Sequence, residues 1–198
     1  MEKDQAGMVT TNFEKHTSKN PLKKFFFKRF ENDLISLISP LNPKNILDAG
    51  CGEGFTLSKF YEFKIGKELE GIDSSEQAVE LGKKMYPHLS LKIGNIYTLR
   101  YIDNYFDIVI CTEVLEHLEN PARALKEIER VSSKYVLLTV PNEPWFTLFN
   151  YTRWGQDIGH INKWSNPSFE KFIIHHSLLV IKEVRNPFPW TMILAKKS

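Results

Sequence analysis

The sequence predicts an α/β protein with a doubly wound, mostly parallel sheet. Short apolar runs with β character alternate with helical patterns through the middle of the chain. A cluster of three glycines follows the first of these runs, and two runs near the C-terminus are close enough to pair as an antiparallel hairpin. Alternation of this kind is typical of an open sheet with helices on both faces, and the expected fold is Rossmann-like.

The elements can be assigned in order along the chain. Residues 21–38 predict an N-terminal helix, because their apolar side chains recur at helical spacing. Strands are expected at 45–49, 68–72, 90–93, 106–111 and 135–140, with helices at 56–63, 75–85 and 121–132. Pro121 stands where a proline is tolerated in the first turn of a helix.

The C-terminal part departs from this alternation. A helix at 166–175 precedes two strand-like runs, 178–184 and 190–195, which are joined by the short segment "RNPFP". We find no internal repeat and no linker, so residues 21–198 are predicted to form a single domain. Residues 1–20 are polar and are predicted to form a flexible tail.

Composition narrows the class of protein. The 198 residues are 42% hydrophobic and 25% charged, with a formal net charge of +2, which does not favour nucleic acid as a partner. Two cysteines, Cys51 and Cys111, cannot form a disulfide framework. The first twenty residues lack the apolar segment of a signal peptide, and no run approaches the roughly 20 residues of a membrane span. A cytoplasmic protein without stable membrane insertion is expected.

The stretch "ILDAGCGEGF", residues 46–55, is the first candidate site. Gly50, Gly52 and Gly54 lie between a predicted strand and a predicted helix, where ligands bind in open α/β sheets. The spacing differs from the dinucleotide pattern G-x-G-x-x-G, whose last glycine would fall at Phe55. A turn without a ligand is the alternative interpretation.

Asp73 ends the second predicted strand, 25 residues after Asp48. A carboxylate at this place can accept hydrogen bonds from both hydroxyls of a ribose. The same aspartate could instead cap the helix that begins near Ser75. Both interpretations stay open at this point.

Five motifs, in order, resemble those of the class I S-adenosylmethionine-dependent methyltransferases. They are "ILDAGCGEG", "GIDSS", "GNIYTL", "FDIVICTEVLEHLENP" and "LLTVPNEP", and they extend from about Asn45 to Pro144. The resemblance is greatest to the small-molecule enzymes that include the ubiquinone and menaquinone methyltransferases. It implies S-adenosylmethionine as cofactor and a small-molecule methyl acceptor.

The resemblance also implies roles for individual positions. The glycine loop would approach the methionine part of the cofactor, Asp73 would bind the ribose, and Glu113 would lie near the sulfonium. Asn95 and Ile96 would meet the adenine, although the family more often has aspartate at position 95. The predicted cofactor-binding residues are Asp48, Gly50, Cys51, Gly52, Gly54, Asp73, Ser74, Asn95, Ile96 and Glu113.

Candidates for a general base are His117, His160, Glu113 and Glu116, and histidine is favoured because it titrates nearest neutral pH. If "TEVLEHL" is helical, Glu113, Glu116 and His117 share one face, and His160 could join them around a divalent metal. That arrangement resembles the small-RNA 3′-end 2′-O-methyltransferases. We predict no metal, because "EVLEHL" also occurs in metal-free relatives.

Two aromatic segments could contact the acceptor. Six large aromatic residues lie between positions 145 and 164, and they favour either a lid over an apolar or aromatic acceptor or a small satellite core: Trp145, Phe146, Phe149, Tyr151, Trp154 and Trp164. The segment "LKKFFFKRF" mixes cations with phenylalanines, which suits a helix packed over the cofactor or one at a membrane interface.

Three functions therefore remain open from the sequence. The first is a methyltransferase for a small, apolar or aromatic acceptor. The others are a metal-dependent RNA 3′-end 2′-O-methyltransferase and an S-adenosylmethionine-binding module without catalysis. The sequence does not indicate an oligomeric state.

Overall fold

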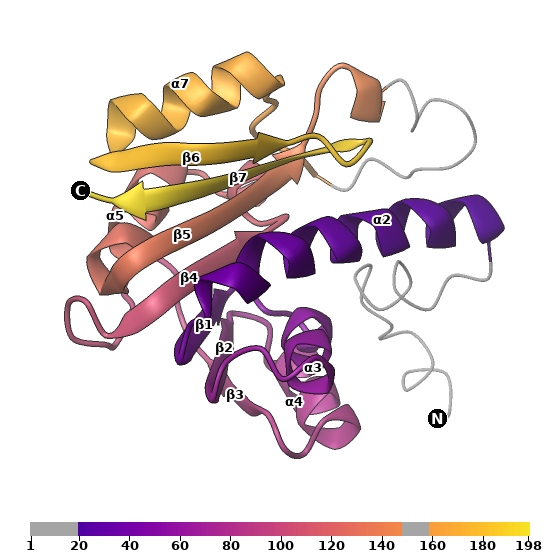
Figure 1. Ribbon diagram of the computed structural model, residues 1–198, viewed down its shortest axis with the longest axis vertical. Helices are drawn as coiled ribbons and strands as arrows, with labels where there is room; N and C mark the ends of the chain where they lie inside the picture. The colour runs from indigo at the N-terminus through magenta and orange to yellow at the C-terminus, as the bar shows by residue number, and fades with distance from the viewer. Residues whose placement is uncertain (1–19, 148–158) are drawn as a thin grey trace, which may run out of the picture.

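The structure is a computed structural model that describes residues 20–147 and 159–198. In this part of the chain, one seven-stranded sheet is flanked by helices (Figure 1). The strands are β1 (Asn45–Ala49), β2 (Glu68–Asp73), β3 (Ser90–Ile93), β4 (Phe106–Thr112), β5 (Ser132–Pro141), β6 (Leu179–Arg185) and β7 (Trp190–Lys197). The α-helices are α2 (Pro21–Ile38), α3 (Phe55–Glu62), α4 (Glu76–Met85), α5 (Pro121–Val131) and α7 (Asn166–His176), and two short 3₁₀ helices are η1 (Ser39–Leu41) and η2 (Leu115–His117).

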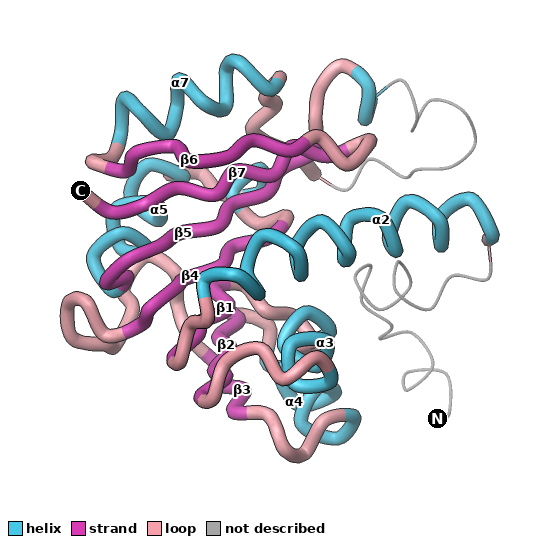
Figure 2. Tube along the Cα trace, in the orientation of Figure 1, coloured by secondary structure: helices cyan, strands magenta, loops and turns pink. Residues whose placement is uncertain are grey.

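The strand order is β3-β2-β1-β4-β5-β7-β6. All neighbouring pairs are parallel except those of β7, which runs antiparallel to both β5 and β6, as the arrows in Figure 1 show. Figure 2 shows the same strands in magenta and the helices in cyan. The expected doubly wound, mostly parallel sheet with an N-terminal helix and a C-terminal antiparallel hairpin is confirmed. β1 and β4 are the strands at which the winding reverses, and such a switch point is where ligands bind in this type of sheet.

Alternating side chains of the strands build two cores, one on each face of the sheet. Ile46 and Ile108 belong to the core beneath α2, α3 and α4, whereas Leu47 and Val109 belong to the core beneath α5 and α7. Because successive strand residues point to opposite faces, the apolar runs Ile46–Leu47 of β1 and Ile108–Cys111 of β4 are buried on both sides of the sheet. Two covered faces leave the carboxyl ends of the strands as the open edge for a ligand.

Some boundaries differ from those expected. The helix predicted over 121–132 ends at Val131, because Ser132 already pairs with Phe106 as the first residue of β5. Asn20 was assigned to the tail but caps α2, since its Oδ1 accepts hydrogen bonds from the backbone of Leu22 and Lys23 at 2.9 and 3.3 Å. Residues 1–19 lie outside the described part of the chain. Within the described residues, none of the helices combines the length and apolar character that crossing a bilayer requires.

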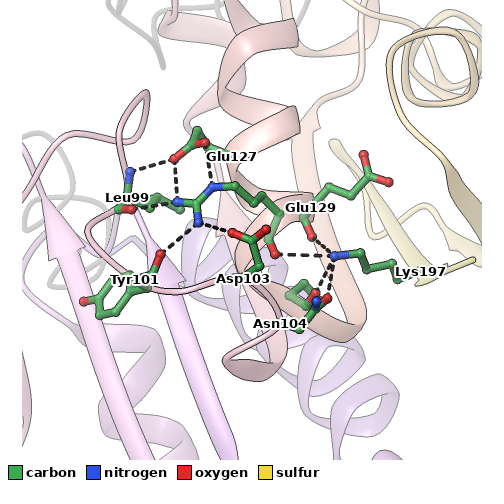
Figure 3. Close-up of polar contacts among 9 residues, drawn as sticks. Leu99, Tyr101, Asp103, Asn104, Glu127, Glu129 and Lys197 are labelled. Carbon is green, nitrogen blue, oxygen red and sulfur yellow. Dashed lines mark hydrogen bonds and ion pairs between the residues drawn. The ribbon is translucent and has the colours of Figure 1, made fainter.

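A polar network holds the amino-end edge of the sheet, opposite the carboxyl ends of the parallel strands (Figure 3). The Arg130 guanidinium binds Glu127 and Asp103 and donates to the carbonyl oxygens of Leu99 and Tyr101 at 2.8 Å. The Lys197 ammonium caps the end of α5 by donating to the carbonyl oxygens of Glu129 and Ser132, and it also binds the side chain of Asn104. These contacts fasten the last strand to the helix and loop that precede β5 and β4.

Candidate functional site

A cavity of about 600 Å³ lies at the carboxyl ends of the central strands, between the glycine loop and α2. Nine of the predicted site residues line it: Gly50, Cys51, Gly52, Asp73, Ser74, Asn95, Ile96, Glu113 and His117. Asp48, Gly54 and His160 are not among the described residues that line it. The sequence-predicted residues therefore converge on one cavity, with three of them behind its wall.

The glycine loop has a left-handed backbone at each of its glycines, with φ of 93° at Gly50, 52° at Gly52 and 84° at Gly54. A Cβ on Gly50 would lie 2.3 Å from Val114 Cγ2, so this glycine lets the loops after β1 and β4 meet. Gly54 is the N-cap residue of α3 and faces Leu91, away from the cavity. Of the three, Gly50 and Gly52 present their backbone to the cavity.

Asp73 joins the glycine loop to the start of α4. Its Oδ2 accepts from the Gly52 N–H and its Oδ1 from the Ser75 N–H, both at 2.8 Å. Ser75 is itself the N-cap of α4, through a bond from the Ala78 N–H to its Oγ. Each carboxylate oxygen can accept a second hydrogen bond, so Asp73 can still receive both hydroxyls of a ribose. The two interpretations of Asp73 are therefore compatible.

Asp48 lies behind the glycine loop and is only 1% exposed. Burial, reinforced by the charge of Asp73, raises the pKa of Asp48 from 3.8 to about 8. Its Oδ1 has no hydrogen-bond partner among the described residues. Burial likewise raises the pKa of the Cys51 thiol, followed in effect by Asp48 and Asp73. Both groups are therefore held uncharged at neutral pH, and Cys51 is not an activated nucleophile.

Asn95 and Ile96 lie in the turn after β3. The Asn95 Oδ1 accepts a hydrogen bond from the Tyr97 N–H at 2.9 Å, which fixes the side chain in a local turn. A carbonyl oxygen has two lone pairs, so one remains for an adenine amino group. The asparagine that replaces the family's aspartate thus keeps the necessary acceptor.

Glu113 follows β4 with a left-handed φ of 58°, which aims its carboxylate toward β5 and β7. Its Oε2 accepts from Trp190 Nε1 at 2.6 Å and its Oε1 from Thr139 Oγ1 at 3.1 Å. Trp190 in turn packs against the rings of Phe27 and Phe30 in α2. Each carboxylate oxygen accepts a hydrogen bond from the wall, and these bonds fix the Glu113 side chain toward β5 and β7, which makes it a poor candidate for a base.

The condition that "TEVLEHL" is helical, on which a shared face of Glu113, Glu116 and His117 depends, is not met. Only Leu115–His117 forms a 3₁₀ turn, because the chain reverses at Glu113 after leaving β4. Glu113 therefore does not share a face with Glu116 and His117. Those two residues gather instead with His160, from a segment far along the sequence, and their ligand atoms lie within 4.8 Å of one another.

The Glu116–His117–His160 cluster is held by backbone contacts. The Glu116 carbonyl oxygen accepts from the N–H groups of Ile161 and Asn162, both at 2.9 Å, and this brings His160 to the 3₁₀ turn. The two imidazole rings lie 4.9 Å apart, and His117 Nε2 is 3.9 Å from Glu116 Oε1. One buried carboxylate and two imidazoles form a donor set that a divalent cation accepts. Only His117 of the three lines the cavity.

Sequence reasoning missed several residues of the cavity, among them Glu31 in α2, Lys59 in α3 and Trp190 in β7. Lys59 is the only lysine or arginine among the described lining residues, and it pairs with Glu62 at 2.9 Å. Burial raises the pKa of Glu31, which the charge of Lys59 partly offsets. The signal for Lys59 was available, since it lies one turn after the glycine loop on the predicted helix. Trp190 carried no such signal, because it reaches the cavity only through the strand order.

The aromatic segment around positions 145–164 does not supply the wall in its described part. Trp145 is 53% exposed, and Trp164 packs on Phe169 and Phe172 of α7. Neither these two nor Phe146 line the cavity, while Phe149, Tyr151 and Trp154 lie outside the described residues. The aromatic side chains that line the cavity come instead from α2, from α3, from Tyr97 and from Trp190.

Comparisons with known proteins point to methyltransferases. A family profile described as a methyltransferase domain matches residues 47–138. A ubiquinone biosynthesis O-methyltransferase of Nitrosomonas europaea is 33% identical over 109 residues, which is 50% of this chain and 44% of that protein. A probable S-adenosylmethionine-dependent methyltransferase of Mycobacterium tuberculosis is 27% identical over 128 residues, covering 64% and 46%. The chain thus spans less than half the length of these two relatives.

One solved structure has a similar fold and contains a bound ligand. Magnesium protoporphyrin IX methyltransferase from Synechocystis, with bound S-adenosylhomocysteine (SAH), superposes with a TM-score of 0.70 at 16% identity. The match covers 96% of this chain and 95% of that one. Matching motifs, sheet order and a cavity at the switch point lead to one family. Residues 47–138 match a methyltransferase domain, and together with the relatives they support a class I S-adenosylmethionine-dependent methyltransferase.

Proposed function

We propose that the protein transfers a methyl group from S-adenosylmethionine to a small acceptor that is apolar or aromatic. The observation that carries this proposal is the composition of the cavity at the carboxyl ends of the central strands. Polar groups of the strand ends line one part of it, and the apolar side chains of α2 line another. A volume of about 600 Å³ is within the range of small-molecule sites.

The residues present fit the cofactor. Asp73 would receive the ribose hydroxyls, Asn95 and Ile96 would contact the adenine, and the bare backbone of Gly52 would face the methionine part. The carboxylate of that part needs a cation, and Lys59 is the one Lys or Arg side chain that the described cavity offers. When bound, S-adenosylmethionine would supply an electrophilic methyl group on a sulfonium sulfur.

The hydrogen bonds within the glycine loop also favour Lys59 as the partner of the cofactor carboxylate. The N–H groups of Gly50 and Cys51 both donate to the Ile72 carbonyl oxygen, and those of Gly52 and Gly54 donate to Asp73 and Cys51. These four donors are therefore used within the protein. A carboxylate that lies over the loop gains more from a charged side chain such as Lys59.

The acceptor would lie against α2. Phe27, Phe30 and Leu34 line the cavity from this helix, and Trp190 faces them from β7. Flat apolar surfaces of this kind suit an aromatic or apolar molecule. Methyl transfer is an in-line displacement, and fixing two reactants in the right geometry contributes up to about 7–11 kcal/mol.

His117 is the candidate base, because it lines the cavity and histidine is the side chain best suited to proton transfer near neutral pH. Its Nδ1 faces the Gly159 carbonyl oxygen at 3.4 Å, which favours a proton on that nitrogen. His160 packs on its ring from outside the cavity and would act by positioning it.

A second function has one observation in its favour. Glu116, His117 and His160 lie together as three of the four groups that a metal-dependent RNA 3′-end 2′-O-methyltransferase would need. The fourth, Glu113, is engaged by Trp190 and Thr139. A small-molecule acceptor without metal is therefore the primary proposal.

Calorimetry without any acceptor tests the cofactor. S-adenosylmethionine and SAH should both release binding heat, and the absence of heat with both would overturn the proposal. The protein with S-adenosylmethionine is then incubated with phenols and quinols, with polar carboxylic acids as matched negatives, and products are read by mass spectrometry. Methylation of the aromatic set supports the proposal. Cofactor binding without methylation of any acceptor supports a non-catalytic binding module.

A further inference from the structure

The outward face of α2 carries an unusual combination of side chains. Leu22 and Phe25 are 42% and 60% exposed, and the cations Lys24, Lys28 and Arg29 are exposed around them. At 100° per residue these five positions fall on one side of the helix. We call Leu22, Lys24, Phe25, Lys28 and Arg29 the α2 outer face.

The opposite side of α2 is fixed by aromatic contacts, so the outer face has a defined direction. Phe26 packs on Phe188 with ring centroids 5.4 Å apart. Phe27 and Phe30 pack on Trp190 at 5.1 and 5.2 Å. Turning Phe25 inward would require these contacts to break.

The positive charge of the outer face is not explained by the helix itself. α2 has no acidic residue in its first turn, although a helix N-terminus favours acids and disfavours cations. Within residues 20–147 and 159–198, Lys24, Lys28 and Arg29 take part in none of the ion pairs that the structure contains. Among the described residues, these cations therefore have no ion pair that would account for their place.

We propose that the α2 outer face docks on an anionic lipid surface. The helix would lie in the plane of the membrane, with Leu22 and Phe25 at the boundary of headgroups and acyl chains. Lys24, Lys28 and Arg29 would face the anionic headgroups. Phe25 lies between the cations on this face. A lipid bilayer binds both the cations and the apolar ring between them, whereas the phosphate backbone of a nucleic acid binds only the cations.

Docking in this way would bring the cavity beside the bilayer. The inner side of the same helix lines the cavity through Phe27, Phe30 and Leu34. An apolar acceptor dissolved in the membrane could then reach the cavity along α2. The docking itself does not depend on the proposed methyl transfer, because the outer-face residues do not line the cavity.

Co-sedimentation of the full chain with vesicles tests the proposal. The protein should bind vesicles of phosphatidylcholine mixed with phosphatidylglycerol, bind little to phosphatidylcholine alone, and dissociate as salt is raised. The double variant Lys24→Glu/Lys28→Glu should lower the partition coefficient at least about tenfold, and Phe25→Ser should lower it several-fold. The matched control Lys171→Glu/Ile174→Ser changes one exposed cation and one exposed apolar residue on α7 and should have no effect.

The outcomes separate docking from the proposed function. All variants should keep wild-type affinity for SAH by calorimetry, which shows that they fold. Failure of the wild-type protein to bind the anionic vesicles would overturn the proposal. Equal loss in the α7 control would also overturn it, as would binding of a fluorescent RNA oligonucleotide through the same residues in the absence of lipid binding.

Discussion

The indole of Trp190 donates a hydrogen bond of 2.6 Å to the carboxylate of Glu113. The two residues are 77 positions apart and come from the start of β7 and the turn after β4. Trp190 also packs against the rings of Phe27 and Phe30, tilted to the first and edge-on to the second. This pair therefore connects the C-terminal hairpin with α2 and with the motif "FDIVICTEVLEHLENP", which contains Glu113, in the wall of the cavity.

Trp190→Phe should keep an aromatic ring against α2 but remove the donor to Glu113. The loss of a hydrogen bond to a charged group predicts a decrease of about 1.5–3 kcal/mol in the free energy of unfolding. Urea denaturation measures it. Trp145→Phe serves as the control, since Trp145 is 53% exposed, and equal stability of the two variants would refute the structural role of the pair.

Asp73→Ala should weaken S-adenosylmethionine affinity by about 1–3 kcal/mol, because hydrogen bonds to a charged carboxylate are lost. Isothermal titration calorimetry measures the change. Glu68→Ala is the matched control, since Glu68 is an exposed acid at the other end of the same strand. Unchanged affinity of the Asp73 variant would remove this residue from the ribose site.

Lys59→Met should weaken cofactor binding while leaving stability almost unchanged. The ion pair of Lys59 with Glu62 is exposed and contributes little to folding, but its charge would face the methionine carboxylate. Lys83→Met removes a comparable exposed pair with Glu80 on α4 and should not affect binding. Equal cofactor affinities of the Lys59 and Lys83 variants would show that Lys59 does not bind the methionine carboxylate.

Asp48 should make the stability fall as pH rises. Its pKa in the folded protein is about 8 against an ordinary 3.8, so the folded protein holds this proton more tightly than the unfolded chain. The contribution is complete below about pH 4 and is lost as pH rises through 8. Asp48→Asn cannot ionise and should unfold with a flatter pH dependence in urea titrations. Above pH 8, the free energy of unfolding of this variant should exceed that of the wild-type protein by a few kcal/mol, since one pKa unit corresponds to about 1.4 kcal/mol.

Chelator separates the two enzyme proposals. We expect activity to be insensitive to EDTA, and His160→Ala to lower the rate modestly through the orientation of His117. If Glu116, His117 and His160 hold an essential ion, activity should vanish with chelator and return with Mg²⁺ or Mn²⁺. Recovery of that kind on an RNA end would replace the primary proposal with the second.

The fold could be predicted because its signals are local. The apolar runs at 45–49 and 106–111 and the glycines after the first run require a strand, a turn and a helix, whatever lies elsewhere. Even the hairpin was visible in the short "RNPFP" joint. The boundary at Ser132 was not, since pairing with Phe106 decides it and that partner is distant in sequence.

The sequence predicts the site residues that belong to motifs. It does not predict those that reach the cavity through tertiary packing. Gly52, Asp73 and Asn95 follow strand ends and so lie at one edge by topology alone. The turn at Glu113 could not be read from "TEVLEHL", because helical spacing there is overruled by the departure from β4 and by the bonds to Thr139 and Trp190. Tertiary contacts also determine that His117, and not His160, lines the cavity.

The position of β7 has a consequence for the order of assembly. β6 comes earlier in the chain, yet β7 takes the interior place beside β5 and leaves β6 at the edge. One end of β7 supplies Trp190 to the cavity, and the other supplies Lys197 to the end of α5. Contacts between such distant segments form late and slowly. A partly folded chain that lacks β7 would therefore have its glycine loop and its first four strands, and still have no closed place for a ligand.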